Sequence, residues 1–362
     1  MSIGDGILKS IEFVKEKKIL EDVVFMRVVL IVLLVLYHSF AIFNGAWEKQ
    51  ADYPDIPAYW WIATSSYAFM LEAFVFISGY VFGHQIKNKG DDILSFNYLI
   101  VRKAKRLLLP GLFFSMIYYA LFYNIHRPMT EIAYSILNGC GHLWFLPMLF
   151  WCFVGIYVIE KLRMRGKWQF AVIVLCSICS FLPLPLRMNN ALYYFLFFYI
   201  GYRCPDYKAI IAPYIRPKYA VAATCLFVGS FAVLTCFNKM GGVNNILIYN
   251  SLLSKITKLS VVNVSRIIYS TNGLLMLYLM INLLLKQNIL HVTPAVLRIS
   301  SMCFGVYIFQ QFILKYLYYY SGLTDICTPL ALPWVGFIIT LVISLLMSWI
   351  ALKTKFGRFL IG

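Results

Sequence analysis

Long apolar runs follow one another through almost the whole sequence, and they constrain the fold more than any other feature. A run of about 20 apolar residues is long enough to cross the hydrocarbon core of a bilayer as a helix. Only 13% of the 362 residues are charged, against about a quarter in soluble domains. We therefore predict an all-α polytopic membrane protein with ten transmembrane helices. The expected spans are 23–45, 60–84, 107–125, 143–161, 168–186, 190–203, 219–237, 266–286, 299–320 and 333–352.

The fifth and sixth predicted spans are weaker than the others. Pro183, Pro185 and Arg187 interrupt the apolar sequence between them, and the sixth run is short for a full crossing. A single re-entrant pair of helices is the alternative for this region.

Basic residues are distributed unevenly between the two sets of loops. With the amino terminus in the cytoplasm, 24 of the 32 lysines and arginines fall on the cytoplasmic side. This bias follows the positive-inside rule and predicts that both termini are cytoplasmic. It also accounts for the net charge of +17 without nucleic acid, for which no binding motif is present. We divide the chain into an amphipathic interfacial segment at 1–22 and a single transmembrane domain at 23–362.

Two predicted outer loops are rich in polar residues. The segment 46–59 is acidic and aromatic, and 238–265 contains many asparagines and serines. Such surfaces suit a hydroxylated, sugar-like ligand, although ordinary solvated loops have the same composition.

The first predicted span carries two ionisable residues, Arg27 and His38. Eleven helical steps place their side chains roughly 20° apart around the helix and about 16 Å apart along it. Ionisable residues inside a membrane are costly and suggest a functional site. A neutral imidazole near the middle of the membrane can accept a proton from an alcohol. The alternative is a histidine that only packs and bonds a backbone carbonyl.

Glu72 is the only acid in the interior of a predicted span. Counting residues from the cytoplasmic ends of the first two spans places it at about the depth of His38. A carboxylate there would orient the imidazole and stabilise its protonated form, as the acid of a catalytic triad does. We therefore predict catalytic roles for His38 and Glu72. A protonated Glu72 that merely joins two helices is the alternative.

Arg102 and Arg106 lie four residues apart, so we expect both on one helix face at the cytoplasmic entrance. Paired guanidinium groups match phosphate and pyrophosphate, but such a cluster can also anchor a helix to anionic lipid.

Further along the chain, His142 and Trp144 are expected near the outer surface. Gln310 and Gln311 are expected inside the ninth span, where their amides contact substrate or join two helices, and of the two we assign Gln310 to the substrate.

Six short motifs follow one another along the chain. They are Arg27 with His38 (R-x10-H), FVFISGY at 74–80, Arg102 with Arg106 and Pro110 (R-x3-R-x3-P), LWFLPML at 143–149, FFYIGY at 197–202 and SSMCFGVYIFQQF at 300–312. In this order they resemble the motifs of the membrane-bound acyltransferase-3 family, whose bacterial members O-acylate cell-surface sugars and other acceptors. One departure is Gln310, where many relatives have histidine, and this leaves His38 as the principal base.

The resemblance implies an O-acyltransferase of the bacterial cytoplasmic membrane that uses cytoplasmic acyl-CoA, with acetyl-CoA as the expected donor. Arg102 and Arg106 would bind the anionic part of the donor, and Arg27 would contact a CoA phosphate or the thioester carbonyl. Ser78 would also lie at the donor site, as a hydrogen-bonding residue and not a nucleophile, beside a closely packed Gly79. No metal is expected.

The acceptor implied by the resemblance is a cell-surface or lipid-linked saccharide, contacted by His142, Trp144 and Gln310. His38 would act as general base or as a transient acyl carrier. Besides the bilayer, acyl-CoA and the saccharide, the expected partner is a separate esterase-like or glycan-assembly protein, because no such domain follows the tenth span.

Two other functions are compatible with the same residues. A transporter or flippase of a lipid-linked saccharide would also have ten spans, but it needs no arginine pair at the inner face. The inverted repeats that are common in transporters are not found. A non-catalytic subunit of a polysaccharide synthesis complex is the second alternative.

Overall fold

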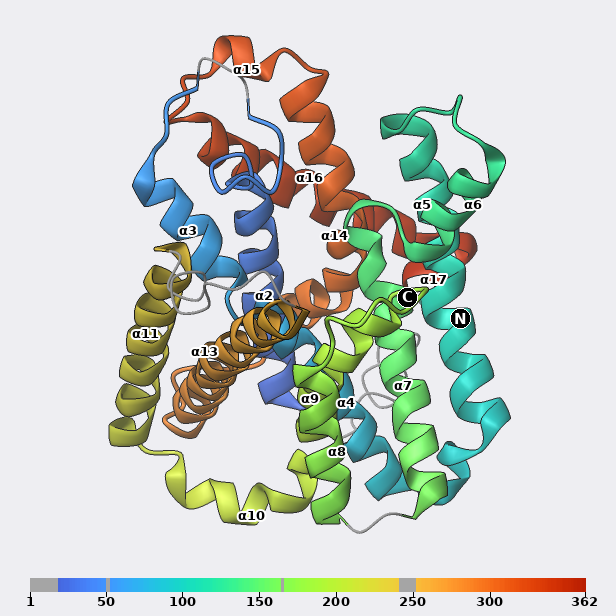
Figure 1. Ribbon diagram of the computed structural model, residues 1–362, viewed down its shortest axis with the longest axis vertical. Coiled ribbons are helices and arrows are strands. Elements are labelled where there is room, and N and C mark those ends of the chain that lie inside the picture. Colours follow the sequence, from blue (N-terminus) through green and yellow to red (C-terminus); the bar gives the residue numbers. More distant parts are fainter. Residues whose placement is uncertain (1–18, 50–52, 164–165, 241–251) are drawn as a thin grey trace, which may run out of the picture.

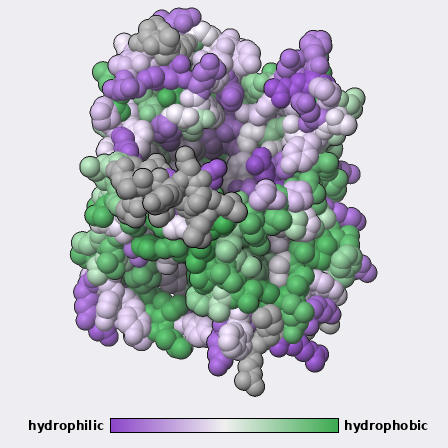
Figure 2. Space-filling view, viewed as in Figure 1, coloured by the Kyte–Doolittle hydropathy of each residue, from purple (hydrophilic) through white to green (hydrophobic). Residues whose placement is uncertain are grey.

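The computed structural model describes residues 19–49, 53–163, 166–240 and 252–362, which form helices and no strands. The predicted interfacial segment at 1–22 lies outside them except for its last four residues. Eight helical segments of the described chain are long and apolar enough to cross a membrane, which confirms an all-α polytopic membrane protein. Hydrophobic residues form a band across the middle of the molecule, with hydrophilic residues above and below it (Figure 2).

The helices pack as a bundle around α2 (Figure 1). Those of the first half are α2 (Glu21–Ser39), α3 (Pro57–Tyr67), α4 (Met70–Lys89), α5 (Leu109–Phe122), α6 (Met129–Asn138), α7 (Phe145–Leu162), α8 (Gly166–Ile178) and α9 (Met188–Arg203). Those of the second half are α10 (Lys208–Ile211), α11 (Pro217–Lys239), α13 (Leu252–Lys286), α14 (Pro294–Tyr319), α15 (Leu323–Ile326), α16 (Leu332–Lys353) and α17 (Lys355–Ile361).

The fifth and sixth predicted spans correspond to α8 and α9, which have only 13 and 16 residues. At 1.5 Å per residue, α8 covers about 20 Å of a hydrocarbon core that is about 30 Å thick. Between the two helices, Leu186 and Arg187 adopt positive φ angles of 51° and 63°, which end any helix. Of the ten predicted spans, eight correspond to described helices that are long and apolar enough to cross a membrane, and α8 and α9 form a shorter pair.

The predicted outer loop at 238–265 is shorter than expected, because α13 already begins at Leu252 and runs for 35 residues. The part at 241–251 lies outside the described residues. Polar side chains of α13 bond to neighbouring helices instead of water. The Asn263 side-chain amide donates to the Ile178 carbonyl (3.0 Å) and the Ser180 hydroxyl (3.1 Å). Asparagine and serine can join helices in this way. Because the same residue types are common in loops, the start of α13 was predicted as part of a loop.

The central helix α2 contacts α3, α4, α13, α14 and α16. It ends at Ser39, six residues before the predicted end of the first span at 45, and the chain then turns, with Gly45 at φ 79°. His38 therefore lies in the last turn of the helix, and not midway along a longer span as predicted. Arg27 and His38 still share one continuous helix.

Helices α4 and α9 pack so closely that their backbones are in contact. A Cβ atom added to Gly79 of α4 would lie 2.1 Å from the carbonyl oxygen of Phe198. A Cβ atom added to Gly201 of α9 would lie 2.1 Å from the carbonyl oxygen of Phe76. Small residues allow this close association of helices, and the close packing predicted at Gly79 is confirmed.

Replacing Gly79 with alanine is expected to lower the thermal midpoint of the detergent-purified protein, because the added methyl group forces α4 and α9 apart. Overpacking of this kind costs about 1–3 kcal/mol. The control is Gly229→Ala on α11, where a Cβ atom meets nothing within 4 Å. Equal midpoints for the two variants would contradict the prediction.

Candidate active site

Two cavities lie against α2 and meet at a shared wall. The first, which we call the histidine cavity, contains His38 and His142 and has a volume of about 330 Å³. The second, the arginine cavity, contains Arg27 and Arg106 and has a volume of about 380 Å³. The shared wall consists of Leu34, Leu71, Phe145 and Tyr307, which line both cavities.

His38 is buried, and one of its ring nitrogens is held by its own helix. Its Nδ1 lies 3.1 Å from the carbonyl oxygen of Leu34. A carbonyl can only accept, so Nδ1 carries the hydrogen and Nε2 keeps its lone pair. No described residue forms a hydrogen bond with Nε2. The Trp47 ring lies 5.8 Å from the imidazole, centroid to centroid. His38 therefore has a nitrogen available to accept a proton inside the cavity.

His142 lines the same cavity, but both of its ring nitrogens are occupied. Nδ1 lies 2.9 Å from Gln311 Oε1, and Nε2 lies 3.0 Å from the carbonyl oxygen of Ile308. The backbone carbonyl of His142 in turn accepts a hydrogen bond from the Tyr307 hydroxyl (2.8 Å). This residue is thus built into the cavity wall. Of the two histidines, only His38 is placed to exchange a proton with a bound molecule.

In the ninth predicted span, Gln311 lines the histidine cavity and Gln310 does not. Gln310 is fully buried, and neither amide atom has a hydrogen-bond partner among the described residues. Gln311 Oε1 accepts from the backbone N–H of His142 (3.0 Å) and from the Tyr118 hydroxyl (3.1 Å). Neighbouring residues project about 100° apart around a helix, so only the rotation of α14 decides between them. Trp144 lines the histidine cavity as well.

Three of the four residues predicted at the donor site line the arginine cavity: Arg27, Ser78 and Arg106. The Ser78 hydroxyl donates to the Phe74 carbonyl of its own helix (3.0 Å), as expected of a residue that is not a nucleophile. Arg102 does not line the cavity. Its guanidinium group lies 5.1 Å from the centre of the Tyr98 ring.

The chain forms π-helical turns at Asn97–Val101 and Ala104–Leu108, on either side of Arg102 and around Arg106. Arg106 lines the arginine cavity and Arg102 does not. That both arginines project from one helix face stays a prediction.

A sequence profile described as an acyltransferase domain matches residues 21–353. The chain belongs to the acyltransferase-3 family. The match covers α2 to α16, and with them almost all of the residues that line the two cavities. No curated protein and no solved structure matches the chain. The two cavities are therefore the candidate active site of a multi-pass membrane acyltransferase.

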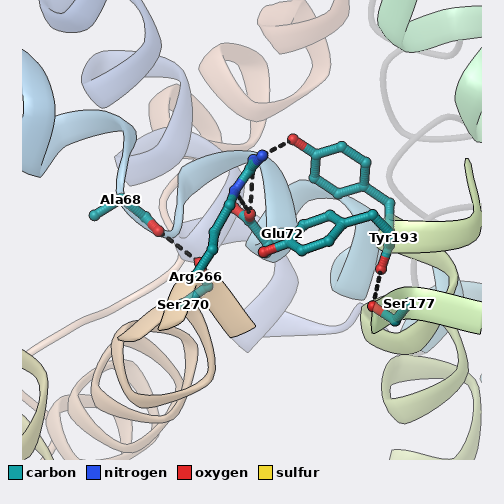
Figure 3. A network of polar contacts seen from close by, with 7 residues as sticks. Ala68, Glu72, Ser177, Tyr193, Arg266 and Ser270 are labelled. Atoms are coloured by element: carbon teal, nitrogen blue, oxygen red, sulfur yellow. Dashed lines mark hydrogen bonds and ion pairs between the residues drawn. The ribbon is translucent and has the colours of Figure 1, made fainter. Parts of the chain in front are cut away.

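In this acyltransferase, Glu72 does not contact His38. Its Oε1 accepts a hydrogen bond from Nε of Arg266 on α13 (3.0 Å), and Nη2 of the same guanidinium group lies 2.9 Å from it in an ion pair (Figure 3). Its Oε2 has no hydrogen-bond partner among the described residues. The predicted pair with His38 is wrong, because equal depth does not determine the rotation of a helix. Glu72 faces α13, whereas His38 faces the cavity.

Arg266 also binds α9, and so it joins three helices. Its Nη2 donates to the hydroxyl of Tyr194 (2.6 Å), and its guanidinium group lies 4.5 Å from the centre of the Tyr193 ring. One turn further, the Ser270 hydroxyl donates to the Ala68 carbonyl (2.7 Å) between α3 and α4. Sequence reasoning missed Arg266 because it lay at the boundary of a predicted outer loop. The signal was Glu72 itself, since a buried acid requires a cation.

Proposed function

We propose that this acyltransferase transfers an acetyl group from cytoplasmic acetyl-CoA to a hydroxyl group of a saccharide at the outer face of the bacterial cytoplasmic membrane. The observation that supports it best is the pair of cavities that meet on α2. One cavity offers cations suited to the phosphates of CoA, and the other offers a histidine with a free ring nitrogen. The shared wall is where donor and acceptor would meet.

The arginine cavity suits the donor. Guanidinium groups bind phosphate through paired, charge-assisted hydrogen bonds, and Arg27 and Arg106 are both available for this. The remaining wall is largely apolar, with Phe74, Ile77 and Leu107 among its residues, and suits the uncharged arm that carries the thioester. The acetyl group would then lie near the shared wall, one turn of α2 from His38.

The histidine cavity suits the acceptor. His38 Nε2 would take the proton of the acceptor hydroxyl while the oxygen attacks the thioester carbon. The C–S bond breaks, and the CoA thiolate leaves with the proton from the imidazolium. Alternatively, Nε2 would itself carry the acetyl group briefly before the hydroxyl attacks it. Aromatic rings of Trp47, Tyr67 and Trp144 line the same space and offer flat surfaces for a sugar ring.

The proposal is tested by incubating the purified protein in liposomes with radiolabelled acetyl-CoA and saccharides. Label that becomes attached to saccharide as an alkali-labile ester supports it, and absence of CoA binding at micromolar concentration contradicts it.

Arg27→Glu and Arg106→Glu should each weaken acetyl-CoA binding by about tenfold or more, and wild-type affinity should fall as salt rises. Arg102→Glu is the matched control and should have a smaller effect. Equal effects at all three positions would mean that the arginines attract the donor only through their positive charge and do not bind its phosphates directly.

A further inference from the structure

Among the described residues that line the histidine cavity, three are basic: His38, His142 and Lys315 of α14. It lies four residues after Gln311, so both side chains project from the same face of the helix. Gln311 holds His142 at one level of the cavity, and Lys315 lies one helical turn further along. Its side chain is partly buried.

The Lys315 ammonium group lies beside two aromatic rings, one of which also lies beside His38. Nζ lies 5.3 Å from the centre of the Trp47 ring and 5.1 Å from that of Tyr319. The Trp47 ring lies 5.8 Å from the His38 ring. The ammonium group is thus within about 11 Å of the imidazole, and one tryptophan contacts both. The Tyr319 hydroxyl donates to the Glu48 carbonyl (2.8 Å), which ties α14 to the segment that carries Trp47.

Glu48 is the described carboxylate whose charge acts on this ammonium group, but it is exposed and does not line the cavity. The cavity lining contains no aspartate or glutamate, and Lys315 forms no ion pair within 4.0 Å with a described residue. A contact with aromatic rings stabilises a cation only modestly and offsets only part of its lost hydration. A bound anion would supply the rest.

We propose that the acceptor is acidic and that its carboxylate or phosphate group binds Lys315 while its reactive hydroxyl lies at His38. This inference rests on the proposed function, because it specifies the acceptor of the same site. The sugar ring would lie on Trp47, between the cation and the base. The separation of Lys315 from His38 suits a charged group on the acylated sugar or on the sugar next to it.

The inference is tested by binding of three probes that share one sugar ring, namely methyl β-D-glucoside, methyl β-D-glucuronoside and glucose 1-phosphate. Tryptophan fluorescence of the full-length protein in detergent reports binding. Wild-type protein should bind one or both charged probes about tenfold more tightly than the glucoside, and added salt should weaken only the charged probes. The tighter of the two charged probes identifies the anion as carboxylate or phosphate.

Substitutions connect this preference to Lys315. Lys315→Gln should abolish it, and Lys315→Arg should retain it, because the charge is kept. Lys239→Gln is the matched control, since that lysine also lies over a tryptophan (Trp60, 4.1 Å) but does not line the cavity. Thermal midpoints should show that all three variants are folded.

The outcomes separate this inference from the proposed function. Equal affinity for the three probes, or a preference that survives in Lys315→Gln, overturns the inference. Acetyl transfer to the neutral glucoside as efficient as transfer to the glucuronoside also overturns it, but leaves the acyltransferase reaction standing. If the anionic probes bind through Lys315 and no acetyl group is transferred to any saccharide, the proposed function fails and the anion site stands.

Discussion

Replacing His38 with alanine is expected to lower the rate of acetyl transfer by about 10²–10⁴-fold, the usual contribution of a positioned proton-transfer group. The physical reason is that Nδ1 is bound to the Leu34 carbonyl, which leaves Nε2 as the available base of the cavity. Binding of acetyl-CoA should change little, because His38 does not line the arginine cavity. The rate is measured as labelled ester formed per folded protein, and the affinity by equilibrium binding.

His126→Ala is the control for this experiment, since His126 is exposed and lies outside both cavities. A wild-type rate in His38→Ala would exclude His38 as base and as acyl carrier. The two roles are separated by incubating wild-type protein with acetyl-CoA and no acceptor. An acetyl group found on His38 by mass spectrometry indicates a carrier, and an unmodified His38 indicates a general base.

Removing Arg266 is expected to destabilise the folded protein by about 3–5 kcal/mol, because the Glu72 carboxylate is left buried without compensation. Removing Glu72 should cost less, since the Arg266 side chain is 30% exposed and keeps its hydrogen bond to Tyr194. Glu72 is fully buried, and its Oε1 accepts a hydrogen bond from Arg266 Nε and forms an ion pair with Nη2. The effect is measured as the loss of unfolding free energy for Glu72→Ala and Arg266→Ala in detergent. The double variant should lose less than the sum of the two single losses.

Two comparisons make this prediction specific. Glu131→Ala breaks an exposed pair with Arg127 and should leave stability almost unchanged. Glu72→Gln should lower stability but keep the rate per folded molecule, if the pair serves only to hold α4 and α13 together. A folded Glu72→Gln protein with a much lower rate would show instead that Glu72 acts on the reaction.

Residues on one helix were the easiest to predict from sequence. Arg27 and His38 share α2 and line adjoining cavities, as their spacing indicates, because the geometry of a single helix is known in advance. The Ser78 hydroxyl bonds a carbonyl of its own helix for the same reason. Contacts between helices were harder. Glu72 was assigned to His38 and binds Arg266, and Gln310 was preferred over Gln311, because neither the rotation nor the neighbours of a helix follow from its own sequence.

The sequence by itself determined that the chain is an all-α membrane protein of the acyltransferase-3 family, because apolar length and motif order are properties of the chain alone. Only the tertiary structure decided which ionisable side chains meet. It paired Glu72 with Arg266, placed Arg106 but not Arg102 in the lining of the arginine cavity, and placed Lys315 beside Trp47 near His38. Each of these results depends on how helices turn and pack against one another, since side chains distant in sequence meet only across helix interfaces.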